Sequence, residues 1–179
     1  IGISLFAGYL LLVQLGKEFS SYSLTNAIST AQNFQEYHTF LAENSQASGY
    51  SLGTYDGTIL GALKKFPLAV NVTLFRPYFW EAHSLIVQIS ALESFVIFVL
   101  TLRLFYLRGV RTVFRKISSN PFILFTLIFS LVFAFAVGFS AYNFGALVRY
   151  KIPCIPFYLV AIFVLDYESK RHKEVSQSV

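Results

Sequence analysis

Residues 121–141 (PFILFTLIFSLVFAFAVGFSA) form an apolar stretch that contains no charged side chain. A helix needs about 20 predominantly apolar residues to cross the hydrocarbon core of a bilayer, and this stretch has that length. Pro121 suits the first turn of a helix, where the N–H that proline lacks would have no partner in the helix. The stretch therefore predicts a transmembrane helix and places the chain among integral membrane proteins.

The composition also points to lipid as the solvent of this chain. Hydrophobic residues make up 55% of it and charged residues only 13%, whereas soluble domains carry about 25% charged residues. The net charge of +5 comes from cations that lie beside apolar runs, which is typical of membrane topology signals. We therefore expect the lipid bilayer as a partner and no binding of nucleic acid.

Alternation of apolar and polar segments predicts an all-α transmembrane bundle with about four crossings. The predicted segments are 1–15, the end of a first transmembrane helix; 16–81, an outward loop; 82–106, a transmembrane helix; 107–120, a basic cytoplasmic link; 121–141, a transmembrane helix; 142–151, an outward link; 152–167, a transmembrane helix; and 168–179, a cytoplasmic tail. Because residue 1 is Ile and the chain contains no Met, we expect a processed form or the C-terminal part of a longer protein.

Cationic side chains indicate how the bundle is oriented. They gather around the 107–120 link and in the tail, at Arg103, Arg108, Arg111, Arg115 and Lys116, and at Lys170, Arg171 and Lys173. An even number of crossings puts both groups on one side, and cytoplasmic loops carry the excess of Lys and Arg. The link and the C-terminus are therefore expected in the cytoplasm.

The outward region between the first two crossings contains two helical patterns. Apolar or amphipathic residues recur at three- and four-residue steps between 24 and 43, which predicts an amphipathic helix; they are Leu24, Ala27, Ile28, Ala31, Phe34, His38 and Leu41. Residues 58–80 are apolar but carry cations, prolines and a cluster of aromatic rings at 75–80. Such residues favour the membrane interface, so a short interfacial or re-entrant helix is expected, with a full crossing as the alternative.

Glu93 is an acidic side chain near the middle of the predicted 82–106 helix. A charged side chain at bilayer depth costs about 2.5–3.5 kcal/mol, so it has to face protein or water. Helical spacing puts Glu93 beside a polar stripe that consists of His83, Ser90, Ser94 and Thr101. Two interpretations remain open: a protonated or paired structural acid that fixes helix contacts, or a functional acid in a proton relay or a substrate contact.

Small residues line one face of the 121–141 helix at Ser130, Ala134, Gly138 and Ala141. Small side chains about one helical turn apart allow two helices in a membrane to approach closely. We interpret these four residues as a packing seam, and we expect the polar face of the 82–106 helix to be its neighbour.

Polar residues of the outward region gather near the predicted membrane surface, at Asp56, Arg76, Glu81, His83, Asn143, Arg149 and Lys151. Arginine is suited to the forked recognition of phosphate. Arg76, Arg149 and Lys151, together with Glu93, are therefore candidate substrate-binding residues. Ordinary anchoring of the cations to lipid headgroups is the alternative.

The motifs of several common enzyme chemistries are missing from this sequence. It has no phosphate-binding glycine loop, no HExxH, no GxSxG and no paired cysteines. Its three histidines, His38, His83 and His172, are scattered. We therefore expect neither a metal nor a cofactor, and the sequence identifies no catalytic residue.

Three runs of the chain resemble the C-terminal portion of large polytopic membrane proteins of Bacteroidota-type bacteria: KKFPLAVNVTLFRPYFWEAHS, SALES and NFGALVRYKIPCIPFYLVAIFVLD. Those proteins are similar to proteins of envelope-polysaccharide assembly. The Arg-Tyr-x-x-Pro-x-x-Pro pattern at 149–156 is also similar to the last crossing of lipid-linked-sugar glycosyltransferases and O-antigen polymerases. The resemblance implies helices upstream of this chain and a location in the bacterial inner membrane.

Two functions from different classes follow from these observations. The resemblance implies a component of envelope-polysaccharide assembly that acts on or near lipid-linked sugars. In this hypothesis Arg76 and Arg149 hold the phosphate of a polyprenyl-linked sugar, and Glu93 serves as an intramembrane acid. The alternative is a non-catalytic accessory subunit of a larger inner-membrane complex, in which the packing seam, the Glu93 stripe and the aromatic-rich run at 75–80 are partner surfaces. Transport is a third hypothesis, and it rests on Glu93 alone.

Overall fold

The computed structural model describes residues 24–44 and 49–177, and these residues form helices without any β-strand. The elements are α2 (Leu24–Asn44), α3 (Ile59–Lys64), α4 (Phe66–Phe75), the 3₁₀ helix η2 (Phe79–Glu81), α5 (Leu85–Arg108), α6 (Val110–Ser119), α7 (Pro121–Ser140), α8 (Phe144–Tyr150) and α9 (Cys154–Gln177). The predicted all-α class is confirmed. The predicted crossing at 1–15 lies outside the described residues.

Two of the described helices, α5 and α7, are long and apolar enough to cross a membrane. Helices α8 and α9 together meet the same requirement up to Lys170, as a pair that is bent by 62°. The described part of the chain therefore has two candidate spans, or three if the bent pair counts as one. A total of four crossings remains a prediction.

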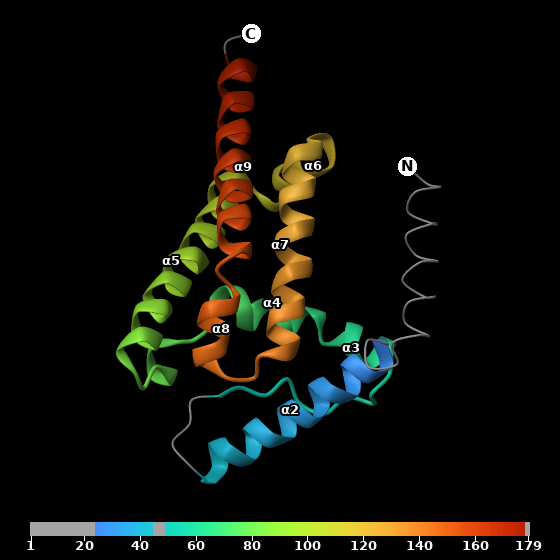
Figure 1. Cartoon of the computed structure of the whole chain (residues 1–179). Coiled ribbons are helices and arrows are strands. Elements are labelled where there is room, and N and C mark those ends of the chain that lie inside the picture. Colours follow the sequence, from blue (N-terminus) through green and yellow to red (C-terminus); the bar gives the residue numbers. More distant parts are fainter. Residues whose placement is uncertain (1–23, 45–48, 178–179) are drawn as a thin grey trace.

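The bundle has two distinct ends, which Figure 1 shows along the upright helices α5, α7 and α9. Helix α6 lies at the same end as the C-terminal part of α9, so the basic link and the start of the tail are together. Helices α2, α3 and α8 lie toward the opposite end. Which end faces the cytoplasm stays a prediction.

Ion pairs connect the helices at the α6 end, where α5, α6 and α9 meet. Asp166 of α9 accepts a hydrogen bond from Arg108 Nε at 2.7 Å and lies 3.9 Å from Arg103. Two residues further along α9, Glu168 accepts a hydrogen bond from Asn120 Nδ2 at 2.6 Å and lies 3.9 Å from Lys116. The basic link is therefore attached to α9 by two carboxylates.

Helix α4 occupies the centre of the bundle and contacts both α5 and α7. Residues 58–80 do not form one long helix, because α3 ends at Lys64 and α4 restarts with Pro67 in its first turn. The hydroxyl of Thr73 donates to the backbone oxygen of Ala134 in α7 at 2.7 Å. This segment thus consists of short helices, of which the apolar α4 packs inside the bundle, and a single helix crossing at 58–80 is not formed.

The four residues of the packing seam, Ser130, Ala134, Gly138 and Ala141, are all buried. The prediction that the polar face of the 82–106 helix would cover the seam is wrong, since α4 lies against it. A Cβ atom on Gly138 would overlap Ala69 O and come within 2.6 Å of Thr73 Oγ1. The missing side chain is the physical reason why the backbone of α4 can lie this close to α7.

Residues 142–151, which we expected to be a polar link, contain the helix α8. Asn143 caps this helix, because its side-chain oxygen accepts a hydrogen bond from the N–H of Gly145 at 2.7 Å. Phe144 and Leu147 of α8 are buried in the core. The segment is therefore a packed part of the bundle, and its polar residues flank an apolar face.

Candidate functional site

The polar stripe of α5 lies where α5 meets the junction of α8 and α9. Ser90 and Ser94 are buried, while His83 precedes α5 and is exposed. The side chain of Glu93 is 42% exposed at the edge of this contact. Glu93 therefore lies between the protein interior and the outer surface of α5.

Lys151 joins this stripe to the loop before η2. Its Nζ atom donates to Ser94 Oγ at 2.8 Å, and Ser94 Oγ donates to the backbone oxygen of Arg76 at 3.0 Å. Glu93 Oε1 lies 3.9 Å from the same Nζ atom. Three of the predicted site residues, Arg76, Glu93 and Lys151, are thus brought together by one chain of polar contacts.

The expectation that Lys151 contacts substrate from an outward link needs correction. Its side chain is 0% exposed, because Lys151 stands at the bend between α8 and α9 and points into α5. A buried amino group needs hydrogen-bond acceptors, and Ser94 supplies one. Lys151 therefore connects helices rather than lining an open surface.

Arg76 also directs its charge to a partner inside the protein. Its guanidinium forms a forked ion pair with Glu81, in which Nε lies 3.1 Å from Oε2 and Nη2 pairs with Oε1. The N–H of Tyr78 donates to the same carboxylate at 2.9 Å. The guanidinium also lies over the rings of Tyr50, Tyr78 and Phe144. The Arg76 guanidinium, which we expected to bind phosphate, is thus already in contact with Glu81 and these rings.

Tyr50 ties the segment after α2 to the end of α7, a contact that sequence reasoning missed. Its hydroxyl donates to Gly138 O at 2.9 Å and accepts from the N–H of Tyr142 at 3.2 Å. Burial raises the pKa of the Tyr50 phenol, although the Tyr142 N–H and Arg76 act in the opposite direction. The phenol therefore stays protonated and can donate. Nothing in the local sequence distinguishes Tyr50 from the other tyrosines.

Arg149 lies apart from this polar chain, on the opposite side of the α8–α9 bend. It is exposed, and its Nε donates to Gly145 O within α8 at 3.1 Å. Within the described residues it forms no ion pair with a carboxylate. It borders an open pocket of about 330 Å³ together with Phe133, Ala136, Val137, Ser140, Tyr150 and Pro153. Of the predicted cations, Arg149 is thus the one that remains open to a ligand.

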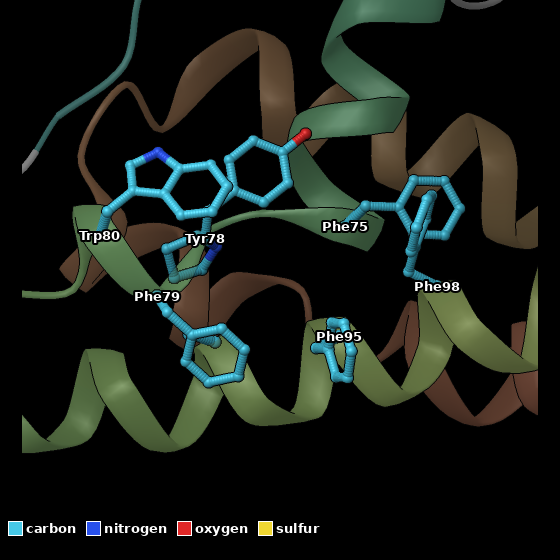
Figure 2. Close-up of a pocket in the computed structure, with 8 residues that line it drawn as sticks. Phe75, Tyr78, Phe79, Trp80, Phe95 and Phe98 are labelled. Atoms are coloured by element: carbon cyan, nitrogen blue, oxygen red, sulfur yellow. The ribbon is translucent and has the colours of Figure 1, made fainter.

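A second pocket of about 200 Å³ lies between α5 and the loop that follows α4 (Figure 2). Its lining is almost entirely apolar and consists of Phe75, Pro77, Tyr78, Phe79, Trp80, Ala91, Phe95 and Phe98. The sequence showed the aromatic cluster at 75–80. It did not show that rings of α5 lie opposite this cluster, because that contact joins residues from two elements.

Within the described residues, no cluster of His, Cys, Asp and Glu side chains could hold a metal ion. Comparison of the chain with models of known protein families finds no match. Comparisons with curated proteins and with solved structures find no match either. The geometry of the two pockets and of the polar chain is therefore the basis for the function proposed below.

Proposed function

We propose that this chain is a membrane-embedded component of envelope-polysaccharide assembly and that it binds the phosphate of a lipid-linked sugar at Arg149. The observation that carries the proposal is the exposed guanidinium of Arg149 at the mouth of an open pocket beside α7. The resemblance of the 149–156 pattern to the last crossing of lipid-linked-sugar enzymes supports the choice of ligand.

The other two candidate cations support this choice by contrast. Arg76 is paired with Glu81, and Lys151 is buried against Ser94. A cation that already has a buried or forked partner gains little from a phosphate, because the existing contact has to break first. Arg149 has no such carboxylate among the described residues, so its Nη atoms are available to a phosphate.

The walls of the Arg149 pocket suit an amphipathic ligand. Phe133 and Val137 of α7 supply an apolar side, while Ser140, Tyr150 and Arg149 supply hydroxyl and guanidinium groups. Arginine binds phosphate oxygens through parallel N–H donors. In this arrangement the guanidinium holds the phosphate, and the hydrocarbon chain of the ligand runs along α7.

The proposal is tested by replacing Arg149 with Ala and measuring the amount and the length of envelope polysaccharide in cells. A hydrogen bond to a charged group contributes about 1.5–3 kcal/mol, so we expect binding of a polyprenyl-linked sugar to weaken about 10- to 100-fold. Arg115→Ala is the matched control, since Arg115 is an exposed arginine of α6 at the opposite end. Unchanged polymer in the Arg149→Ala strain would refute the proposal.

The second candidate function, an accessory subunit of a larger inner-membrane complex, has its own supporting observation. Much of α5 is exposed, and the half-exposed Glu93 lies between exposed apolar neighbours such as Leu92 and Val96. A carboxyl group in this setting favours a polar partner. Stoichiometric co-purification with other subunits in mild detergent supports this function. A stable monomer that retains sugar lipid supports the first one.

We further propose that the α6 end faces the cytoplasm of a bacterium, in agreement with the cation count. The single cysteine, Cys154, is buried, so an added cysteine can be labelled selectively. Ser118 of α6 is exposed. With the cytoplasmic orientation, Ser118→Cys is protected from a membrane-impermeant thiol reagent in intact cells and reacts after the membrane is opened.

A further inference from the structure

We propose that the aromatic pocket between α5 and the loop at 77–80 holds one acyl chain of a zwitterionic membrane phospholipid. This site is separate from the Arg149 pocket, which borders α7. The inference therefore does not depend on the function proposed above.

The shape and chemistry of the pocket fit a hydrocarbon chain. Figure 2 shows Tyr78 and Trp80 on one side, with Phe79 and Phe95 facing them. The first two rings are stacked with centroids 4.9 Å apart, and the second pair lies at 5.7 Å. Phe75 and Phe98 close the far end at 5.5 Å. Such walls offer extensive apolar contact and very few hydrogen-bonding groups.

The position of the pocket gives a chain direct access from the bilayer. Ala91, Phe95 and Phe98 belong to α5, which is one of the candidate membrane spans. Trp80 is 75% exposed, and tryptophan and tyrosine concentrate at the level of the lipid headgroups. A chain that enters past Trp80 and Tyr78 thus keeps its headgroup at the interface.

The charges beside the pocket select a zwitterionic headgroup over an anionic one. Arg76 and Glu81, which flank the lining residues 77–80 in the chain, pair with each other and together carry no net charge. A phosphate–ammonium headgroup has no net charge and needs no unpaired cation at this site, whereas an anionic headgroup meets Glu81 without an unpaired cation to balance it. The occupant is therefore a phospholipid of the phosphatidylethanolamine or phosphatidylcholine type.

The test uses the single tryptophan of the chain, Trp80. Changing Trp80 to Phe and Phe95 to Trp moves the fluorophore onto the α5 wall of the pocket. The matched control carries Trp80→Phe with Leu102→Trp, since Leu102 is exposed on the same face of α5 but does not line the pocket. Both proteins are titrated in detergent with phosphatidylcholine brominated on its acyl chains.

We expect quenching of the residue 95 reporter to saturate near one lipid per protein, while the residue 102 reporter is quenched gradually without saturation. Ala91→Leu narrows the pocket and should weaken the saturable quenching at least fivefold. Because Ala91 is buried and this change can affect folding, Phe79→Ala is a second variant: Phe79 is half exposed, so its loss removes one wall of the pocket with little effect on the core.

Two results would overturn the inference. Equal, unsaturable quenching of both reporters means that α5 is only coated by lipid and that the pocket binds no chain. Competition by unbrominated lipids tests the headgroup: phosphatidylcholine should displace the brominated lipid, and phosphatidylglycerol should displace it at least fivefold less well. If phosphatidylglycerol or undecaprenyl phosphate competes better, the assignment of a zwitterionic lipid is wrong.

Discussion

Helices α5 and α7 are both long and apolar enough to cross a membrane, yet they are held in the bundle in different ways. No side chain of α7 is charged, and its contact to α4 runs along small residues, Ala134 and Gly138. Helix α5 carries Glu93, Arg103 and Arg108, and a smaller share of it is buried. Its contacts include a hydrogen bond from Ser94 to the backbone oxygen of Arg76. A second hydrogen bond joins Thr101 and Tyr158.

This difference between α5 and α7 follows from the lipid that surrounds them. Lipid tails are as apolar as leucine, so burial of apolar side chains does not by itself hold helices together in a bilayer. Close backbone approach and interhelical hydrogen bonds take over this role. Helix α7 relies mainly on close backbone approach, to which Thr73 adds one hydrogen bond, and its contact with α4 cannot accept added volume. Helix α5 relies on hydrogen bonds, and its contact cannot accept the loss of a polar partner.

The largest expected effect comes from filling the seam of α7. In Gly138→Leu, the new Cβ would overlap the backbone oxygen of Ala69 and crowd Thr73 Oγ1, so α4 has to move away from α7. Overpacking a core costs about 1–3 kcal/mol, and a clash with backbone belongs at the upper end or beyond. The free energy of unfolding, measured in detergent by titration with SDS, should fall by about 3 kcal/mol.

Val132→Leu is the control for this prediction, because Val132 lies on the same helix but is 55% exposed. The control should unfold within about 0.5 kcal/mol of the original chain, as surface substitutions usually do. If Gly138→Leu is as stable as the control, α4 does not lie against the seam.

The second prediction concerns the polar contact of α5. Ser94→Ala removes the acceptor of the buried Lys151 amino group, which Ser94 holds at 2.8 Å. Leaving a buried polar group without its partner costs about 1–3 kcal/mol. Lys151→Met keeps a similar volume and removes the amino group together with its need for a partner. The first variant should lose about 2 kcal/mol of stability and the second less than about 1 kcal/mol.

The double variant Ser94→Ala/Lys151→Met makes this contrast sharper. Because neither polar group of the pair remains, it should be more stable than Ser94→Ala alone, which is a strongly non-additive outcome. A double variant whose loss equals the sum of the single losses would show that Ser94 and Lys151 act independently.

The contrast between α5 and α7 also explains how far the fold could be predicted from sequence. Length and apolar character are properties of one segment, so the stretch at 121–141 and the helical class could be predicted. The identity of the helix that packs against the Gly138 seam could not be predicted. It depends on α4, and only tertiary packing sets this helix against α7. The cations and aromatic rings of residues 58–80 favoured the membrane interface and did not indicate a helix as neighbour.

The candidate site shows the same limit. The cations at 76, 149 and 151 were visible in the sequence as possible phosphate ligands, but their partners were not. Glu81 is close to Arg76 in the chain, so that pair could have been foreseen. The contact between Ser94 and Lys151 joins residues 57 positions apart, and only the bend between α8 and α9 brings them together.

The smallest expected effect lies at the basic end, where two arginines of α5 share one carboxylate of α9. Arg108 lies 2.7 Å from Asp166 with a side chain only 12% exposed, whereas Arg103 lies at 3.9 Å with 54% of its side chain exposed. Solvent screens an exposed pair and leaves it a median contribution of about 0–1 kcal/mol. Arg108→Gln should therefore lower the free energy of unfolding by about 1 kcal/mol, and Arg103→Gln by less than about 0.3 kcal/mol.

Since screening by salt acts on the exposed pair first, raising the salt concentration should leave most of the Arg108 effect in place. Equal losses in the two variants would mean that Asp166 is shared evenly and that burial does not separate the two ion pairs.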